Sequence, residues 1–294
     1  MGLLRKRVLL FEPENSDRRG VFSGMYAIGL SRRSALAMLG SSMLAGCGFL
    51  GKDLGTYRFR LTLSVNTPEG VREASGVMEA SYGLEQVIGR GEVSNHRLKG
   101  EAVFLDLGNA RNLVMLLVHG PRGADVNQMA WLPTTALLKK PWGMGSAEAL
   151  AEGLKLEGSV ELIPALIPTI VTFSDLNNPA TAQIVYATGV GPQDRDPLTI
   201  QPKREQYAVI DTISETFGSG YSFRGVTLKM VSAGIWPLNY FGITGQQVTS
   251  GIEKHLTWLS KPLPWLKSNN RGAYIDTRPQ DSFRLNIEHL KRVI

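Results

Sequence analysis

The strongest constraint on this chain is an alternation of side chains between residues 57 and 66. Five apolar residues alternate there with five polar ones, the apolar set being Tyr57, Phe59, Leu61, Leu63 and Val65. Successive side chains of a β-strand point to opposite faces, so this period of two predicts a half-buried strand. A strand with one apolar face needs a second layer to cover it, and the chain must therefore build a core around this segment.

The alternation continues into two predicted hairpins. The turn Thr67-Pro68-Glu69-Gly70 has Pro second and Gly fourth, which is typical of a type I turn, so residues 71–82 should return as the antiparallel partner. Residues 101–107 and 112–118 predict a second hairpin, and the LVMLLV run in its second strand is apolar enough for the middle of a sheet.

Shorter elements follow without regular alternation of strand and helix. Strands are expected at 183–187 and at 221–231, the latter with a bulge at Gly225. Short helices are expected within 125–138, where Pro133 interrupts, at 147–154 after Ser146, at 207–217 before Gly218, and after Thr249 or Ser250. This order predicts an α+β fold with a mostly antiparallel sheet built from hairpins and interspersed short helices. A β-sandwich with helical insertions is the alternative.

Composition excludes several classes of protein. With 43% hydrophobic and 20% charged residues among 294, the chain is not of the disordered class, and its one Cys excludes an internal disulfide or a Cys-based zinc site. The first 46 residues hold seven basic and three acidic residues, which leaves only +2 of the net charge of +6 for the remaining 248. We therefore expect no nucleic-acid partner for the body.

The charge near the N-terminus is arranged as in an export signal. Arg32 and Arg33 precede a stretch of twelve uncharged residues, 35–46. Twelve helical residues would cover about 18 Å, well below the roughly 30 Å of a bilayer's hydrocarbon core. The stretch therefore predicts a signal sequence rather than a membrane span.

The stretch ends in Leu44-Ala45-Gly46-Cys47, which resembles the lipobox of bacterial lipoproteins. The resemblance implies that the thiol of Cys47 is alkylated by a diacylglycerol, that the peptide before it is cut, and that the new amine is often acylated. Two or more acyl chains anchor a protein stably, whereas one does so only marginally. The expected organisation is an export signal over 1–46, a lipidated tether over 47–55 and a single globular domain over 56–294.

Three alternatives remain open around this leader. Ser31-Arg32-Arg33 also resembles a twin-arginine export motif, although Ala35 stands where that family usually has a bulky aromatic, so the Sec and Tat routes both remain. Residues 1–24 are either a misassigned extension before a start at Met25 or a long n-region. If residues 35–46 are not a cleaved lipoprotein signal, two alternatives remain. They are an uncleaved membrane anchor, or a buried helix of an unlipidated soluble protein in which Cys47 fills apolar space.

The body carries a second resemblance. Its YRFRLT strand, its TPEG turn and its late SGIEK and LxWL segments are similar to an uncharacterised group of alphaproteobacterial proteins, over residues 57–266. This resemblance implies no activity.

The sequence contains no strong catalytic motif. The glycine spacing of residues 46–52 fits nucleotide-binding loops, but Asp53 replaces the Ser or Thr that would meet magnesium, and no strand precedes it. His119, which directly follows the LVMLLV run, is the candidate general base, although a polar residue leaving the core is the simpler interpretation. The other histidines lack metal-ligand spacing; they are His96, His255 and His289. The candidate acids are Asp106, Asp125, Asp175, Asp194, Asp196 and Asp211.

The segment from Trp258 to Lys267 allows two interpretations. Its Trp258 and Trp265 alternate with Lys261 and Lys267, as in an interfacial membrane patch or a partner groove. A strap whose Trp side chains cover the core is the interpretation that we favour.

Together these observations predict a non-enzymatic cell-envelope lipoprotein. We expect a binding or structural module on the periplasmic face of a membrane, held by acylated Cys47, with an envelope protein as a further partner and with no metal or cofactor. Gly48 after the Cys is not the Asp of inner-membrane retention, which favours the outer membrane. The alternatives are an envelope hydrolase that uses His119 and an unlipidated soluble protein.

Overall fold

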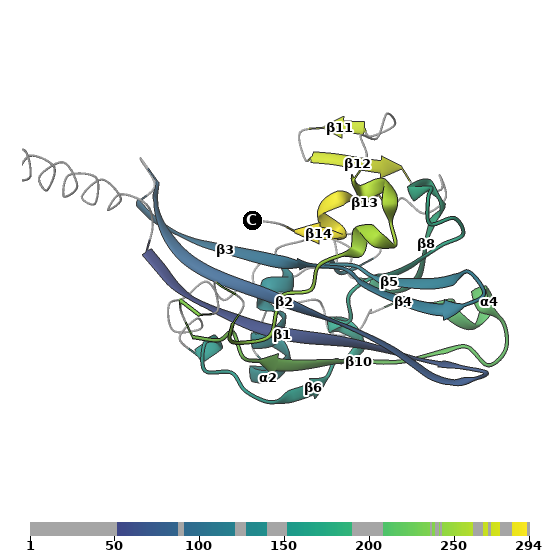
Figure 1. Cartoon of the computed structure of the whole chain (residues 1–294), viewed down its shortest axis with the longest axis horizontal. Helices are drawn as coiled ribbons and strands as arrows, with labels where there is room; N and C mark the ends of the chain where they lie inside the picture. Colours follow the sequence, from purple (N-terminus) through teal and green to yellow (C-terminus); the bar gives the residue numbers. More distant parts are fainter. Residues whose placement is uncertain are drawn as a thin grey trace, which may run out of the picture. The chain divides into compact units, whose positions relative to one another are not determined.

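Two antiparallel sheets enclose a shared core in the computed structural model of this chain (Figure 1). The structure describes residues 52–87, 91–120, 128–139, 152–189, 208–235, 237–238, 241, 243–260, 267–269, 272–276 and 284–292. Contacts divide the chain into the units Met1–Phe49 and Leu50–Ile294, and all of the described residues belong to the second. The predicted export signal lies outside them.

The first sheet is built on the predicted hairpin. Strand β1 (Lys52–Thr67) pairs with β2 (Gly70–Val87) from Thr67 opposite Gly70 to Lys52 opposite Leu84, which confirms the strand, the turn and the returning partner. β1 begins at Lys52, four residues before the domain start expected at residue 56. The strand order is β14-β3-β2-β1-β10-β6. The remaining strands of this sheet are β3 (Gly91–Glu101), β6 (Ser159–Glu161), β10 (Ser222–Val231) and β14 (Lys291–Arg292).

The second sheet contains the second predicted hairpin. Its order is β4-β5-β7-β8-β9, and β4 pairs with β5 antiparallel. β4 follows β3 after the single residue Ala102, whose N–H donates to the Leu290 carbonyl, so the chain passes from one sheet to the other there. The strands are β4 (Val103–Gly108), β5 (Arg111–Met115), β7 (Ile170–Phe173), β8 (Ala182–Gly189) and β9 (Ala208–Asp211).

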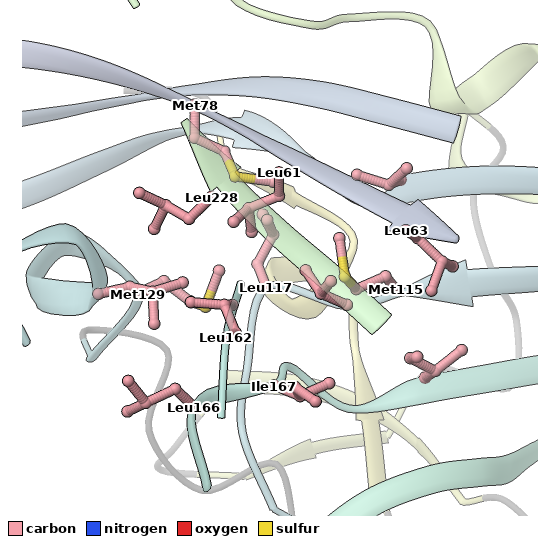
Figure 2. Packing of buried hydrophobic residues seen from close by; sticks show 14 of the residues in the cluster. Leu61, Leu63, Met78, Met115, Leu117, Met129, Leu162, Leu166, Ile167 and Leu228 are labelled. Atoms are coloured by element: carbon pink, nitrogen blue, oxygen red, sulfur yellow. The ribbon is translucent and has the colours of Figure 1, made fainter. Parts of the chain in front are cut away.

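The core between the sheets is lined by the apolar faces that the alternation predicts. Figure 2 shows Leu61, Leu63 and Met78 pointing toward Met115 and Leu117. All five apolar residues of the β1 alternation are at most 4% exposed. The other face of β5 and of the residues after it is also buried, because Val114, Leu116 and Val118 belong to a second core with the C-terminal segments. Burial on both faces explains why the LVMLLV run does not alternate.

Helix α2 (Gln128–Leu138) corrects one expectation, because Pro133 lies inside it instead of ending it. Proline removes a backbone N–H and normally breaks a helix interior. Here Met129, Ala130 and Leu132 are fully buried against the core, and tertiary packing outweighs the local preference. The Ala130 carbonyl oxygen also lies within hydrogen-bond distance of the hydroxyls of Tyr57 and Tyr82.

Two further expected helices are corrected. Residues 207–217 contain β9 followed by the short helix α4 (Ile213–Phe217), because the first half pairs with β8, with Val209 opposite Thr188. The last helix is two 3-10 helices, η5 (Ile252–Lys254) and η6 (Thr257–Ser260). Neither Thr249 nor Ser250 caps η5, because its N-cap is Gly251, and the Thr249 hydroxyl instead accepts from the N–H of Val77. Of the helix expected at 147–154, the structure describes only residues 152–154.

The remaining elements complete an α+β fold of mostly antiparallel sheets, as predicted. The bulge expected at Gly225 is present, because the β1–β10 register shifts between Ser64 and Val65. The polar C-terminal end, for which no element was predicted, forms a third sheet of β11 (Lys267–Asn269), β12 (Gly272–Asp276) and β13 (Arg284–Asn286). Further 3-10 helices are η2 (Pro164–Leu166), η3 (Pro179–Thr181) and η7 (Ile287–His289).

Candidate functional site

The residues predicted from the leader lie outside the described part of the chain. They are Arg32, Arg33, Leu44, Ala45, Gly46 and Cys47. What the structure places is the point at which the folded body begins. β1 starts at Lys52, five residues after Cys47.

His119 is held in the loop that follows β5. Its Nε2 lies 3.0 Å from the carbonyl oxygen of Leu166, which can only accept, so Nε2 carries the hydrogen. Burial lowers the pKa of His119 to about 4, and the hydrogen bond to Leu166 opposes this shift. The imidazole is therefore neutral at pH 7 and a weak base, which disfavours the predicted role in general-base catalysis.

Each described candidate acid accepts a hydrogen bond from a backbone N–H two residues later, within a turn. Asp106 accepts from the N–H of Gly108 at 2.8 Å, and Asp175 accepts from the N–H of Asn177 at 2.9 Å. Asp211 accepts from the N–H of Ile213 between β9 and α4. These are Asx-type turns, whose carboxylates replace missing backbone acceptors. Asp125, Asp194 and Asp196 lie outside the described residues.

The described residues form no metal-binding group, and Trp258 of the Trp-rich segment lies in the core. Among the described residues, no group of three or more His, Cys, Asp or Glu side chains is placed to hold a metal ion. Trp258 is 3% exposed and packs near Phe173 in the second core, as the core-strap interpretation expects. Trp265 lies outside the described residues.

The most unusual surface of the described body is a segment that the sequence analysis did not single out. Four of the eight exposed large apolar side chains of the described residues lie within nine positions of one another. They are Ile235, Leu238, Phe241 and Ile243, with exposed fractions of 71%, 41%, 67% and 68%. We call the described residues from Ser232 to Gln246 the apolar loop. The signal that could have found it is the complete lack of Asp, Glu, Lys and Arg from residue 230 to residue 252.

Hydrogen bonds close the base of the apolar loop. The N–H of Gln246 donates to the Ser232 carbonyl at 2.9 Å, joining the two ends. The N–H of Ile235 donates to Thr244 Oγ1 at 3.0 Å, and the N–H of Ile243 donates to the Leu238 carbonyl at 2.9 Å. These hydrogen bonds close the loop on itself, while its four large apolar side chains stay exposed.

Two glycines make this closure possible. Gly234 has φ +84°, and a Cβ there would lie 2.5 Å from the Thr244 carbonyl oxygen. Gly245 has φ +80°, and a Cβ there would lie 2.6 Å from the carbonyl carbon of Ala233. Only glycine combines positive φ with such a close approach of two backbone segments.

The loop is fixed to the polar face of the first sheet. The guanidinium of Arg58 donates to the Gln246 carbonyl at 2.6 Å, and Arg60 donates to the Gln246 side-chain oxygen. Three residues later, Thr249 bonds Val77 of β2 through both its N–H and its hydroxyl. The chain after the loop thus crosses the face that β1 and β2 turn away from the core.

The loop lies at the end of the sheet where β1 begins. β10 leads into the loop, and its last residue, Val231, pairs with Arg58, six positions after Lys52. Figure 1 shows the arrowhead of β10 pointing toward the end of the sheet where β1 begins. Leu154, 38% exposed, is at this end too, because a Cβ on Gly55 would come within 2.6 Å of its side chain.

No helix among the described residues combines the length and the apolar character needed to cross a membrane. Comparison with protein-family models, with curated proteins and with solved structures found no match.

Proposed function

We propose that this chain is a cell-envelope lipoprotein. Lipid on Cys47 holds the folded body at the periplasmic face of a membrane, where it acts as a binding or structural module without catalysis. The observation that carries the proposal is the order Arg32-Arg33, twelve uncharged residues and a lipobox-like Cys47, which is the one cysteine of the chain.

The start of the folded body supports a short tether. Lys52 lies five positions after Cys47, and a fully extended chain over five positions reaches at most about 18 Å. A lipid on Cys47 would therefore keep the beginning of β1 close to the bilayer surface. Such an anchor does not depend on any feature of the folded body.

The described side chains favour a role without catalysis. His119 is a weak base, with a pKa of about 4, and the described carboxylates Asp106, Asp175 and Asp211 accept hydrogen bonds within turns. A hydrolase would need a base poised near the operating pH beside an activated group. The fold instead offers an exposed apolar surface, which is typical of contact with a membrane or a protein.

The test is metabolic labelling of the full chain with a fatty-acid analogue in a bacterial host. The wild-type chain should take up the label, and Cys47→Ala should lose it. Ser42→Ala, which changes the same uncharged stretch but leaves residues 44–47 intact, should keep it. Mass spectrometry that finds an uncut chain with an unmodified Cys47 in the wild type would contradict the proposal.

A further inference from the structure

We infer that the apolar loop is a second membrane contact, whose side chains Ile235, Leu238, Phe241 and Ile243 insert into the bilayer that holds the lipid. The inference rests on the proposed function for the nearness of that bilayer. It adds a property that lipidation does not imply, namely a fixed face of the body turned to the membrane.

Exposure distinguishes these side chains from the rest of the surface. Single exposed apolar residues are normal on soluble proteins, and Val71, Ile163 and Val209 are of that kind. A group of four in one loop, three of them more than 60% exposed, is not explained by chance scatter. Such a group gains free energy when a partner removes it from water.

The construction of the loop keeps these side chains outside. Its ends are joined by the Gln246–Ser232 hydrogen bond and fixed to the sheet through Arg58 and Arg60. Thr249, just beyond the loop, is fixed to Val77. The loop therefore cannot fold back onto either core to bury its apolar side chains without breaking this base.

The charge pattern selects a bilayer rather than a protein as the occupant. The 23 residues from 230 to 252 contain no charged side chain, so insertion of the apolar side chains would carry no ion of the segment itself into the bilayer. A protein-binding loop commonly adds a polar or charged rim that fixes the register of the complex. The sequence of this segment also holds Trp236 and Tyr240, residue types that are enriched at membrane interfaces.

The position of the loop supplies the second argument for a bilayer. Val231, directly before the loop, pairs with Arg58 of β1, and β1 begins five residues after Cys47. A contact near the tether acts at a high effective concentration of membrane, so a weak apolar contact is sufficient. Leu154, against Gly55, adds a further exposed apolar side chain at the same end.

The experiment compares two isoleucines in the full chain purified from membranes. Ile243→Cys places a thiol in the apolar loop, and Ile163→Cys places one at a matched site between β6 and η2, since the two isoleucines are 68% and 61% exposed. Each is labelled with the polarity-sensitive fluorophore NBD and reconstituted into vesicles of phosphatidylethanolamine and phosphatidylglycerol, with and without brominated acyl chains. Urea unfolding confirms that both variants are folded.

We expect the probe at 243 to shift to shorter wavelength with vesicles and to be quenched several-fold more by brominated lipid than the probe at 163. Equal quenching of the two probes, or no quenching of either, overturns the inference. If the probe at 243 already emits at the shorter wavelength without vesicles, the inference is overturned as well, because the loop would then contact protein.

Mass spectrometry of the same samples shows whether Cys47 carries lipid, and it therefore distinguishes a failure of this inference from a failure of the proposed function. A lipidated Cys47 with an unquenched probe at 243 rejects the loop contact and keeps the anchor. An unmodified Cys47 would itself take up NBD, so in that case the measurement is repeated on Cys47→Ser/Ile243→Cys. A quenched probe at 243 in that variant, after vesicles are added, rejects the lipoprotein and keeps the membrane contact.

Discussion

The guanidinium of Arg58 lies 2.6 Å from the carboxylate of Glu79 on the polar face of the first sheet, and it also donates to the backbone carbonyl of Gln246. The two side chains are only 11% and 20% exposed. One ion pair therefore joins two neighbouring strands to the base of the apolar loop. Because the guanidinium is largely removed from water, these partners compensate the free-energy cost of burying its charge.

Glu79→Gln should lower the free energy of unfolding by about 1–3 kcal/mol, because it leaves the partly buried Arg58 charge uncompensated. Urea denaturation measures the change. The control is Glu69→Gln, whose ion pair with Arg72 is 46% and 67% exposed and should matter by less than about 1 kcal/mol. If the two substitutions lowered the free energy of unfolding equally, the Arg58–Glu79 pair would stabilise the protein no more than an exposed ion pair does.

The closure of the apolar loop predicts a strong effect of a single methyl group. Gly245→Ala should destabilise the protein by about 2–3 kcal/mol, because the residue has φ +80° and its Cβ would clash with Ala233. Gly108→Ala is the control, since Gly108 has φ +81° but open space around a Cβ, and should cost about 1 kcal/mol. Thermal unfolding of both variants tests the difference, and equal losses would remove the steric explanation.

The sequence predicted the first sheet well because its signal is local. The alternation at Tyr57–Val65 and the TPEG turn determine the strand faces and the hairpin register without information from distant residues. The helix interior at Pro133 and the strand at Val209 depend instead on tertiary partners, namely the core around α2 and the edge of β8. Neither partner can be inferred from the few residues around the element.

The apolar loop was not predicted for a related reason. Apolar residue types alone do not tell an exposed segment from a core segment, and only the structure places Phe241 and Ile243 outside both cores. What holds them there is non-local, since Arg58 lies 188 positions before Gln246. The predicted lipid site remains a sequence prediction, because Cys47 lies outside the described residues.

The paired tyrosines under α2 should be energetically coupled. The hydroxyls of Tyr57 and Tyr82 lie 2.7 Å apart, and both contact the Ala130 carbonyl. Each change to Phe should cost about 1–2 kcal/mol of unfolding free energy, since a buried hydrogen bond is lost. The double variant should cost less than the sum of the two single variants. Each single variant already loses the hydrogen bond between the two hydroxyls, and the double variant loses that bond only once. Strict additivity in urea denaturation would exclude a shared network.

Burial also predicts that these tyrosines resist ionisation. Loss of solvent raises the pKa of both Tyr57 and Tyr82 above the ordinary value of 10, and the mutual hydrogen bond opposes this for Tyr57 but adds to it for Tyr82. Absorbance titration of the folded wild type should therefore show at least two fewer ionising tyrosines near pH 10–11 than the unfolded chain, since burial also raises the pKa of Tyr186. The Tyr57→Phe/Tyr82→Phe variant should leave the folded titration unchanged, and a loss of signal there would contradict the prediction.

The stability of the C-terminal segment should depend on pH through His289. Burial and, to a smaller extent, the charge of Arg292 lower the pKa of His289 to about 4. Its Nδ1 accepts the N–H of Asn286 in the capping box of η7, which requires the neutral ring. Between pH 6.5 and pH 4 the unfolded chain therefore binds more protons than the folded one, so stability falls as the pH falls through this window.

The test compares the wild type with His289→Gln, because glutamine at this capping-box position can accept the same N–H without titrating. Urea denaturation at pH 7 and at pH 4 should show that the wild type loses on the order of 3 kcal/mol more than the variant over this range. His255→Gln, which removes an exposed histidine stacked on Phe104, is the matched control and should follow the wild type. If His289→Gln lost as much stability as the wild type, the ring would not be held neutral by the fold, and the capping box would not depend on its protonation.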